Sequence, residues 1–158
     1  MYRLWYLIIN FFSREANPND VDHVKIVYGN VNNGEGTSYV GRKGGMQELT
    51  LGHKMDKYKI KHLFMHTIGF YHEHNRPDRD QNVEISWDNI QESSKPFFNK
   101  RKFMEKFNIS YDFNSIMHYP ENAFSNHQKR NGNDGKTIKP LVSIKRFYSM
   151  STQKGINL

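Results

Sequence analysis

Three histidines and a glycine at fixed spacing constrain this chain more than any other feature of its sequence. They form the pattern His-x-x-x-His-x-x-Gly-x-x-His, whose fixed positions are His62, His66, Gly69 and His72. Residues four apart lie one above the other on a helix, so His62 and His66 can point at one ion. Glycine is common just past a helix end, so Gly69 lets the chain turn and bring His72 back to the same ion. The spacing therefore predicts a helix that ends beside a metal site.

The donor set indicates which metal this site would take. Three neutral imidazoles suit Zn²⁺ and leave a fourth position open for water, which is typical of a catalytic zinc site. With 8 His and 11 Gly in the chain, the full pattern arises by chance on the order of one time in a thousand. Two other interpretations stay open, namely three unrelated histidines and a metal retained only for stability. We predict one zinc ion held by His62, His66 and His72.

The residue after the first histidine argues against full activity. In the mechanism that uses this spacing it is Glu, which takes a proton from zinc-bound water and passes it to the leaving amine. Here it is Leu63, which cannot accept a proton. General acid–base help contributes ~10²–10⁴ in rate, roughly 3–5 kcal/mol of barrier. Glu73 follows the third histidine, so we expect it to point away from the ion and not to substitute.

Strand patterns occupy the first third of the chain, and a helix pattern follows them. Ile60, Phe64 and Ile68 are spaced four apart, so they share one helical face. The predicted strands are Val21–Tyr28, Ser38–Val40, Gln47–Leu51 and Val83–Trp87, and the predicted helices are Tyr58–Ile68 and a weak one over Asp88–Lys106 that Pro96 breaks.

The N-terminus has two interpretations. The apolar run Leu4–Ile9 follows an early arginine, as the hydrophobic region of a signal peptide does. Asn10 interrupts that run, however, and no small-x-small cleavage site follows it. The segment Tyr6–Phe12 equally fits a buried strand before the turn-like residues Asn17–Asp20, and we favour the strand.

The composition limits the kinds of partner. The 158 residues suit a single domain over residues 1–158. The net charge is +7, but the lysines are scattered among Asp and Glu, so we expect no nucleic-acid binding. The absence of cysteine excludes disulfides and thiolate metal sites. No apolar run approaches the length of a membrane-spanning helix.

Two ordered stretches of the chain resemble the astacin family of metallopeptidases, within the metzincin group. Residues 62–80, HLFMHTIGFYHEHNRPDRD, match the family's zinc signature HExxHxxGFxHExxRxDRD at every fixed position except the Glu. Residues 115–119, SIMHY, resemble the family's Met-turn, SxMHY. Shorter similar stretches are residues 22–26, 38–45, 47–52, 83–90 and 111–113, so the likeness runs over roughly residues 8 to 157.

The resemblance implies an α+β, metzincin-like fold and a zinc endopeptidase activity. A twisted mixed sheet and the active-site helix would form an upper sub-domain over about residues 1–69. An irregular lower sub-domain would cover residues 70–158, with the zinc cleft between the two. The resemblance also implies that zinc-activated water hydrolyses an extended peptide or protein, and that the protein is secreted.

The same resemblance assigns roles to residues outside the zinc triad. Met117 would support the histidines from below, and Tyr119 would be an extra ligand that swings away to stabilise the oxyanion. Gly69 would end the upper sub-domain, and Glu73 would stand where the family's mature N-terminus is met. The edge near Ser38–Val40 would pair with the substrate by strand addition.

Three departures from the family pattern point to a divergent or incomplete copy. The general base is replaced by Leu63, and the family's cysteines are absent, with Ile8, Gly36 and about Lys54 at the matching positions. Losing a native disulfide typically costs ~2–5 kcal/mol. The family's first strand, first helix and propeptide have no counterpart here.

The departures leave more than one hypothesis for function. The first is a zinc endopeptidase whose hydrolysis is impaired by Leu63. The second is a non-catalytic, zinc-containing module that binds peptides or proteins. A third, a basic surface protein with incidental histidines, is disfavoured by the joint presence of His62, His66, His72 and the Met-turn.

Overall fold

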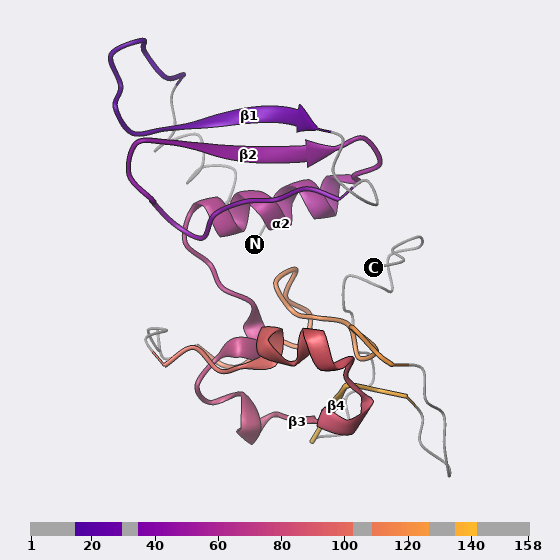
Figure 1. The fold of residues 1–158 in the computed structure, drawn as a ribbon. Coiled ribbons are helices and arrows are strands. Elements are labelled where there is room, and N and C mark those ends of the chain that lie inside the picture. The colour runs from indigo at the N-terminus through magenta and orange to yellow at the C-terminus, as the bar shows by residue number, and fades with distance from the viewer. Residues whose placement is uncertain (1–14, 30–34, 103–108, 127–134, 142–158) are drawn as a thin grey trace.

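The protein is built from two parts, stacked one above the other in Figure 1 and joined by the chain that leaves helix α2. The structure is a computed structural model that describes residues 15–29, 35–102, 109–126 and 135–141. Both interpretations of the N-terminus lie outside the described residues. None of the helices that are described is long and apolar enough to cross a membrane.

The upper part contains a small mixed sheet. Strands β1 (His23–Gly29) and β2 (Met46–Gly52) pair in parallel over their full lengths, with His23 opposite Met46. Thr37 forms an antiparallel bridge on the other side of β2, where its amide and carbonyl each bond Thr50 at 2.9 Å. The sheet is therefore mixed, as the resemblance implies, with parallel pairing on one side of β2 and an antiparallel bridge on the other.

Local signals set both ends of helix α2 (Lys57–Thr67). The Asp56 carboxylate accepts hydrogen bonds from the amides of Tyr58 and Lys59, at 2.8 and 2.9 Å, and so caps the first turn. At the other end the Gly69 amide donates to His66 and the Phe70 amide donates to Met65. This pair of bonds is a Schellman motif, and it needs the positive φ of 104° that Gly69 adopts.

A small core joins α2 to the sheet. Leu49 and Leu51 of β2 pack against Leu63 of α2, and all three side chains are buried. Burial of a leucine side chain stabilises the fold by about 1.5–3 kcal/mol. The core therefore fixes the rotation of α2 beneath the sheet, and with it the direction in which the neighbouring His62 and His66 point.

The lower part has little regular structure. Strands β3 (Val83–Ile85) and β4 (Ile138–Pro140) pair antiparallel, and short 3₁₀ turns surround them. Buried polar side chains satisfy much of the irregular backbone. The Arg79 guanidinium donates to the carbonyls of His74 and Phe98, and its side chain is 4% exposed. The core here is Val83, Ile90, Phe98, Ala123 and Ile138.

Most of the predicted elements are confirmed, and two are wrong in kind or extent. Ser38–Val40 is not a regular strand, because in this segment Thr37 alone forms a bridge with β2. The Gly41 amide donates to the carbonyl of His66, which draws the segment toward α2. In the described residues 88–102, the weak helix predicted over Asp88–Lys106 is replaced by a 3₁₀ helix at Glu92–Phe98 that contains Pro96, after a shorter one at Trp87–Asn89. Proline lacks an amide hydrogen, so a longer α-helix would lose a bond there.

Gly36 lies against both the sheet and α2. A Cβ placed on it would collide with the carbonyl oxygen of Thr50 and with Cδ1 of Leu63. The leucine at position 63 therefore occupies space that any side chain at position 36 would need. Two of the departures from the family pattern, at positions 36 and 63, are thus in physical contact.

We predict that Gly36→Ala destabilises the protein by at least ~1–3 kcal/mol, the usual cost of overpacking. Urea unfolding would measure the change, with Glu35→Ala at the neighbouring, partly exposed position as the control. Adding Leu63→Ala should restore only part of the loss, because the Thr50 carbonyl still blocks the new methyl group. A Gly36→Ala protein as stable as the wild type would contradict this packing.

Candidate metal centre

The three histidines of the sequence pattern converge on one point. His62 and His66 project from adjacent turns of α2, and His72 comes from the lower part, just after the chain crosses between the two parts. The Nε2 atom of His72 lies 3.1 Å from that of His66 and 3.2 Å from that of His62. Among the described residues, these three form the one group of at least three His, Asp or Glu side chains whose donor atoms lie that close together.

Backbone carbonyls fix the tautomers of two of these rings. Nδ1 of His62 lies 2.9 Å from the carbonyl of Ile116, and Nδ1 of His66 lies 2.8 Å from that of Phe70. A carbonyl only accepts, so each Nδ1 carries the proton and each Nε2 presents a lone pair. The lone pairs of His62 and His66 therefore face the ring of His72, where both can bind a metal cation.

The nitrogen separations match a tetrahedral zinc site. Zinc binds imidazole nitrogen at about 2.0–2.1 Å, which places two tetrahedral ligands about 3.3–3.4 Å apart. The observed 3.1 and 3.2 Å agree with that to within a few tenths of an ångström. Neutral imidazoles with a second ring nitrogen bonded to a carbonyl are the usual zinc ligands. The residues present therefore fit zinc.

Burial keeps these histidines neutral. It lowers the pKa of His62 to about 4, an effect that the bond from its ring to Ile116 only partly offsets. Burial also lowers the pKa of His66 and of His72, and the neighbouring His74 adds to the effect at His72. At neutral pH all three rings are therefore in the form that binds a metal.

The segment around Met117 ties the two parts together at the site. Its neighbour Ile116 accepts the bond from His62, and the Met117 carbonyl accepts a 2.9 Å bond from the Glu73 amide beside His72. The Met117 side chain is buried. His118 is fixed on both sides, since its Nδ1 donates to the Tyr119 carbonyl and its Nε2 accepts from the Tyr111 hydroxyl, each at 2.6 Å.

Tyr119 packs against His72 and a second histidine, His74, with its ring tilted to that of His72 and stacked on that of His74. Its ring centre lies 4.6 Å from that of His72 and 4.0 Å from that of His74. Burial, and then the negative charge of Glu35, raise the pKa of Tyr119 to about 12. The hydroxyl is therefore protonated at neutral pH and able to donate a hydrogen bond.

Glu73 points away from the three histidines and into the lower part. Its Oε1 accepts from Arg76 at 2.8 Å and from the Asp112 amide at 2.9 Å. Arg76 also pairs with Asp78. The carboxylate therefore holds the loop at Asp112 in place and is not available to assist at the metal site.

Leu63 offers nothing to the metal site either. Its side chain turns into the core with Leu49 and Leu51 and is 7% exposed. The position next to the first ligand is thus occupied by a packing residue, and no carboxylate of α2 faces the histidines.

Two residues near the site were missed by the sequence reasoning. His74 is fully buried, stacks on Tyr119, and has a ring nitrogen, Nδ1, without a partner among the described residues. Its position two residues after His72 was the signal in the sequence that could have identified it. Glu35 carried no such signal, because only the tertiary structure brings it close enough to influence Tyr119.

Comparison with known proteins places the site in a family. The model of the peptidase family described as "Astacin" matches residues 8–148. The zinc metalloproteinase nas-6 of Caenorhabditis elegans is 38% identical over 137 residues, which cover 74% of this chain and 39% of that protein. Human tolloid-like protein 2 is 48% identical over 92 residues, which cover 56% of this chain and 9% of that protein.

A solved structure shows the same likeness in three dimensions. The structure of high choriolytic enzyme 1, a hatching enzyme zinc-protease from the medaka fish Oryzias latipes, matches with a TM-score of 0.68 at 36% identity. The match covers 80% of this chain and 60% of that one. The chain therefore spans less than two thirds of each relative compared.

We predict that the metal-free protein loses stability as the pH falls from about 6.5. In the unfolded chain His62 and His118 take up protons near pH 6.5, but burial lowers both folded pKa values to about 4. The unfolded state therefore binds more protons between these values, and each group removes up to ~1.4 kcal/mol per pH unit. Urea unfolding at pH 7, 6 and 5 would test this above the range in which carboxylates titrate. Unchanged stability between pH 7 and 5 would contradict it.

We also predict that the protein binds one zinc ion per chain and that His66→Ala weakens binding by more than ~100-fold. Loss of a residue that merely supports a ligand already costs 10–100-fold. Competition with a chromophoric chelator would measure the affinity, and His53→Ala, in the exposed turn before α2, is the matched control. Equal zinc affinities of His66→Ala and His53→Ala would contradict the predicted zinc site.

Proposed function

The chain belongs to the astacin family of zinc metalloproteases, and from that premise we propose that it binds zinc and extended peptides but hydrolyses them poorly. The observation that carries the proposal is Leu63, buried in the core where the family places its general base. The three histidines are the ligands of the zinc. When bound, zinc would polarise a peptide carbonyl and lower the pKa of a bound water.

The residues of this chain can bind and polarise a peptide carbonyl, but they lack a group on α2 that transfers the proton from water to the leaving amine. Tyr119, protonated at neutral pH, can donate a hydrogen bond to the oxygen of a carbonyl under attack. Proton transfer from water to the leaving amine has no acceptor on α2, because position 63 is leucine. Without that transfer the rate falls by ~10²–10⁴. Slow hydrolysis remains compatible with this arrangement.

The segment Ser38–Val40 offers a place for an extended peptide. Thr37 faces β2, and alternation along an extended chain turns the backbone groups of Ser38 and Val40 the other way. Within the described residues, no backbone hydrogen bond is made by Ser38 or Val40. These open groups could pair with a peptide by strand addition.

A non-catalytic binding module is the second candidate function. The open edge and the zinc ligands favour it as much as they favour a slow enzyme, and Leu63 favours it more. In this role zinc would hold α2 to the lower part through His72 and so keep the peptide site in shape. The extracellular location that the family resemblance implies applies equally to both candidates.

We predict that Leu63→Glu raises zinc-dependent peptide hydrolysis by ~10²-fold or more. The matched control is Leu63→Ala, which also removes packing against Leu49 and Leu51, at a cost of ~2–5 kcal/mol, but adds no carboxylate. A quenched fluorescent peptide library, assayed with and without zinc, would measure the rates of all three proteins.

The outcomes separate the two candidate functions. Weak wild-type turnover that rises in Leu63→Glu but not in Leu63→Ala would support an impaired enzyme. Peptide binding with no cleavage in any of the three proteins would favour the binding module. Rapid zinc-dependent turnover by the wild type would contradict the proposal that Leu63 limits catalysis.

A further inference from the structure

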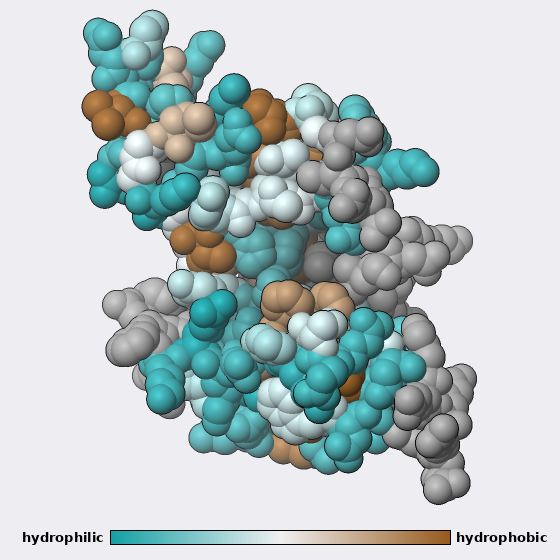
Figure 2. Space-filling model, viewed as in Figure 1, coloured by the Kyte–Doolittle hydropathy of each residue, from teal (hydrophilic) through white to brown (hydrophobic). Residues whose placement is uncertain are grey.

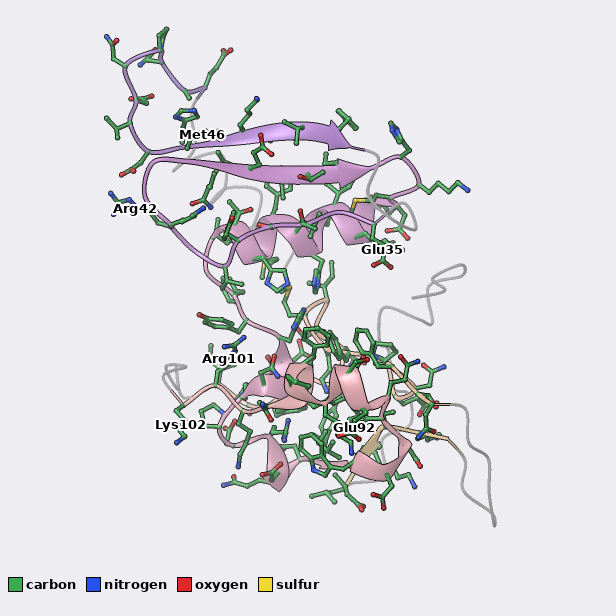
Figure 3. All side chains as sticks on the ribbon, in the orientation of Figure 1. Glu35, Arg42, Met46, Glu92, Arg101 and Lys102 are labelled. Atoms are coloured by element: carbon green, nitrogen blue, oxygen red, sulfur yellow. The ribbon has the colours of Figure 1, made fainter. Side chains whose placement is uncertain are left out.

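The two ends of the groove between the upper and lower parts carry opposite charges. Figure 2 shows the groove crossing this face of the molecule, with hydrophilic residues at its floor. In Figure 3 the labelled Glu35 side chain lies at the end of the groove where α2 begins. Arg101 lies at the opposite end, below the chain that leaves α2.

Glu35 presents its carboxylate to the groove. It sits just before the edge segment Ser38–Val40, and its negative charge raises the pKa of the Tyr119 hydroxyl. Its nearest cation is Lys59, whose Nζ lies 3.9 Å from Oε1, at the outer limit of an ion pair. Such partly exposed pairs contribute only about 0–1 kcal/mol, and a carboxylate can accept several hydrogen bonds. Glu35 can therefore bind a second cation.

Arg101 presents a guanidinium at the other end. Its cation lies over the ring of Tyr71, 5.2 Å from the ring centre, and Tyr71 directly precedes the ligand His72. Its amide donates to the Asn75 carbonyl at 2.8 Å, which anchors the residue beside the metal centre. No carboxylate of the described residues pairs with Arg101. The charge is therefore open to a ligand.

The length of α2 sets the distance between these charges. From Lys59, which pairs with Glu35, to its last residue, Thr67, the helix rises about 12 Å, and Tyr71, which Arg101 contacts, lies four residues further along the chain. An extended peptide advances about 3.3 Å per residue. Side chains about five residues apart would therefore reach both ends.

We propose that the groove selects extended peptides with a basic side chain at the Glu35 end and an acidic side chain, about five residues away, at the Arg101 end. This inference rests on the proposed peptide binding along Ser38–Val40. Strand pairing fixes the direction of the peptide backbone, so only one order of the two charges matches the groove. The reverse order places like charges together at both ends.

The test measures binding of three fluorescent peptides to the zinc-loaded protein by anisotropy. Two have identical composition, with Lys and Glu five residues apart in opposite orders, and the third is neutral. One order should bind about tenfold more tightly than the other at low salt, with the neutral peptide between them. Because the charges are exposed, raising the salt concentration should narrow the difference.

Matched variants test whether Glu35 and Arg101 cause the preference for one charge order. Glu35→Gln and Arg101→Gln should each reduce the difference between the two orders by about threefold. Glu48→Gln is the control for Glu35, because Glu48 also pairs with a lysine at 3.9 Å but lies on β2. Lys102→Gln is the control for Arg101, because Figure 3 shows Lys102 farther from the groove.

Two results would overturn the inference in different ways. Equal binding of all three peptides, or an equal effect of Glu35→Gln and Glu48→Gln, would overturn the charge preference and leave peptide binding intact. Failure of every peptide to bind would overturn the proposed peptide binding itself, and the charge preference with it.

Discussion

The structure depends on the approach of three imidazole nitrogens to one point between its two parts. Two of them belong to α2 in the upper part and one belongs to the lower part, at separations of 3.1 and 3.2 Å. Carbonyls of Ile116 and Phe70 hold the ring protons on the far side, so the lone pairs face inward. A zinc ion bound at that point would therefore also link the two parts of the structure.

Leu63, next to the first histidine, is part of the packing of the upper part. Leu63 fills the space beneath β2, and it can do so because Gly36 has no side chain. A larger residue at 36 would collide with Leu63 and with the backbone of Thr50. Position 63 thus supplies an apolar contact that stabilises the helix carrying His62 and His66. The residues at positions 36 and 63 belong to one local arrangement.

The lower part is held together mainly by side-chain hydrogen bonds to its backbone and has few regular strands or helices. Buried Arg79 and Asn75 donate to the carbonyls of the 3₁₀ segments, and Glu73 holds the loop at Asp112. Each bond satisfies a backbone group that a helix or a sheet would otherwise satisfy. This network holds His72 and Tyr119 beside α2, although few strands form the lower part.

The sequence alone predicted the three histidines that converge in the structure, the helix that carries two of them, and the family. These depend on local signals, because the spacing of His62 and His66 and the turn at Gly69 act within a few residues. Only the tertiary structure decided the tautomers, the contact between Gly36 and Leu63, and the place of Glu35. Those features depend on contacts between residues far apart in the chain, such as His62 and Ile116, which are 54 positions apart. They follow from how α2 packs on the sheet and on the lower part, which no local pattern encodes.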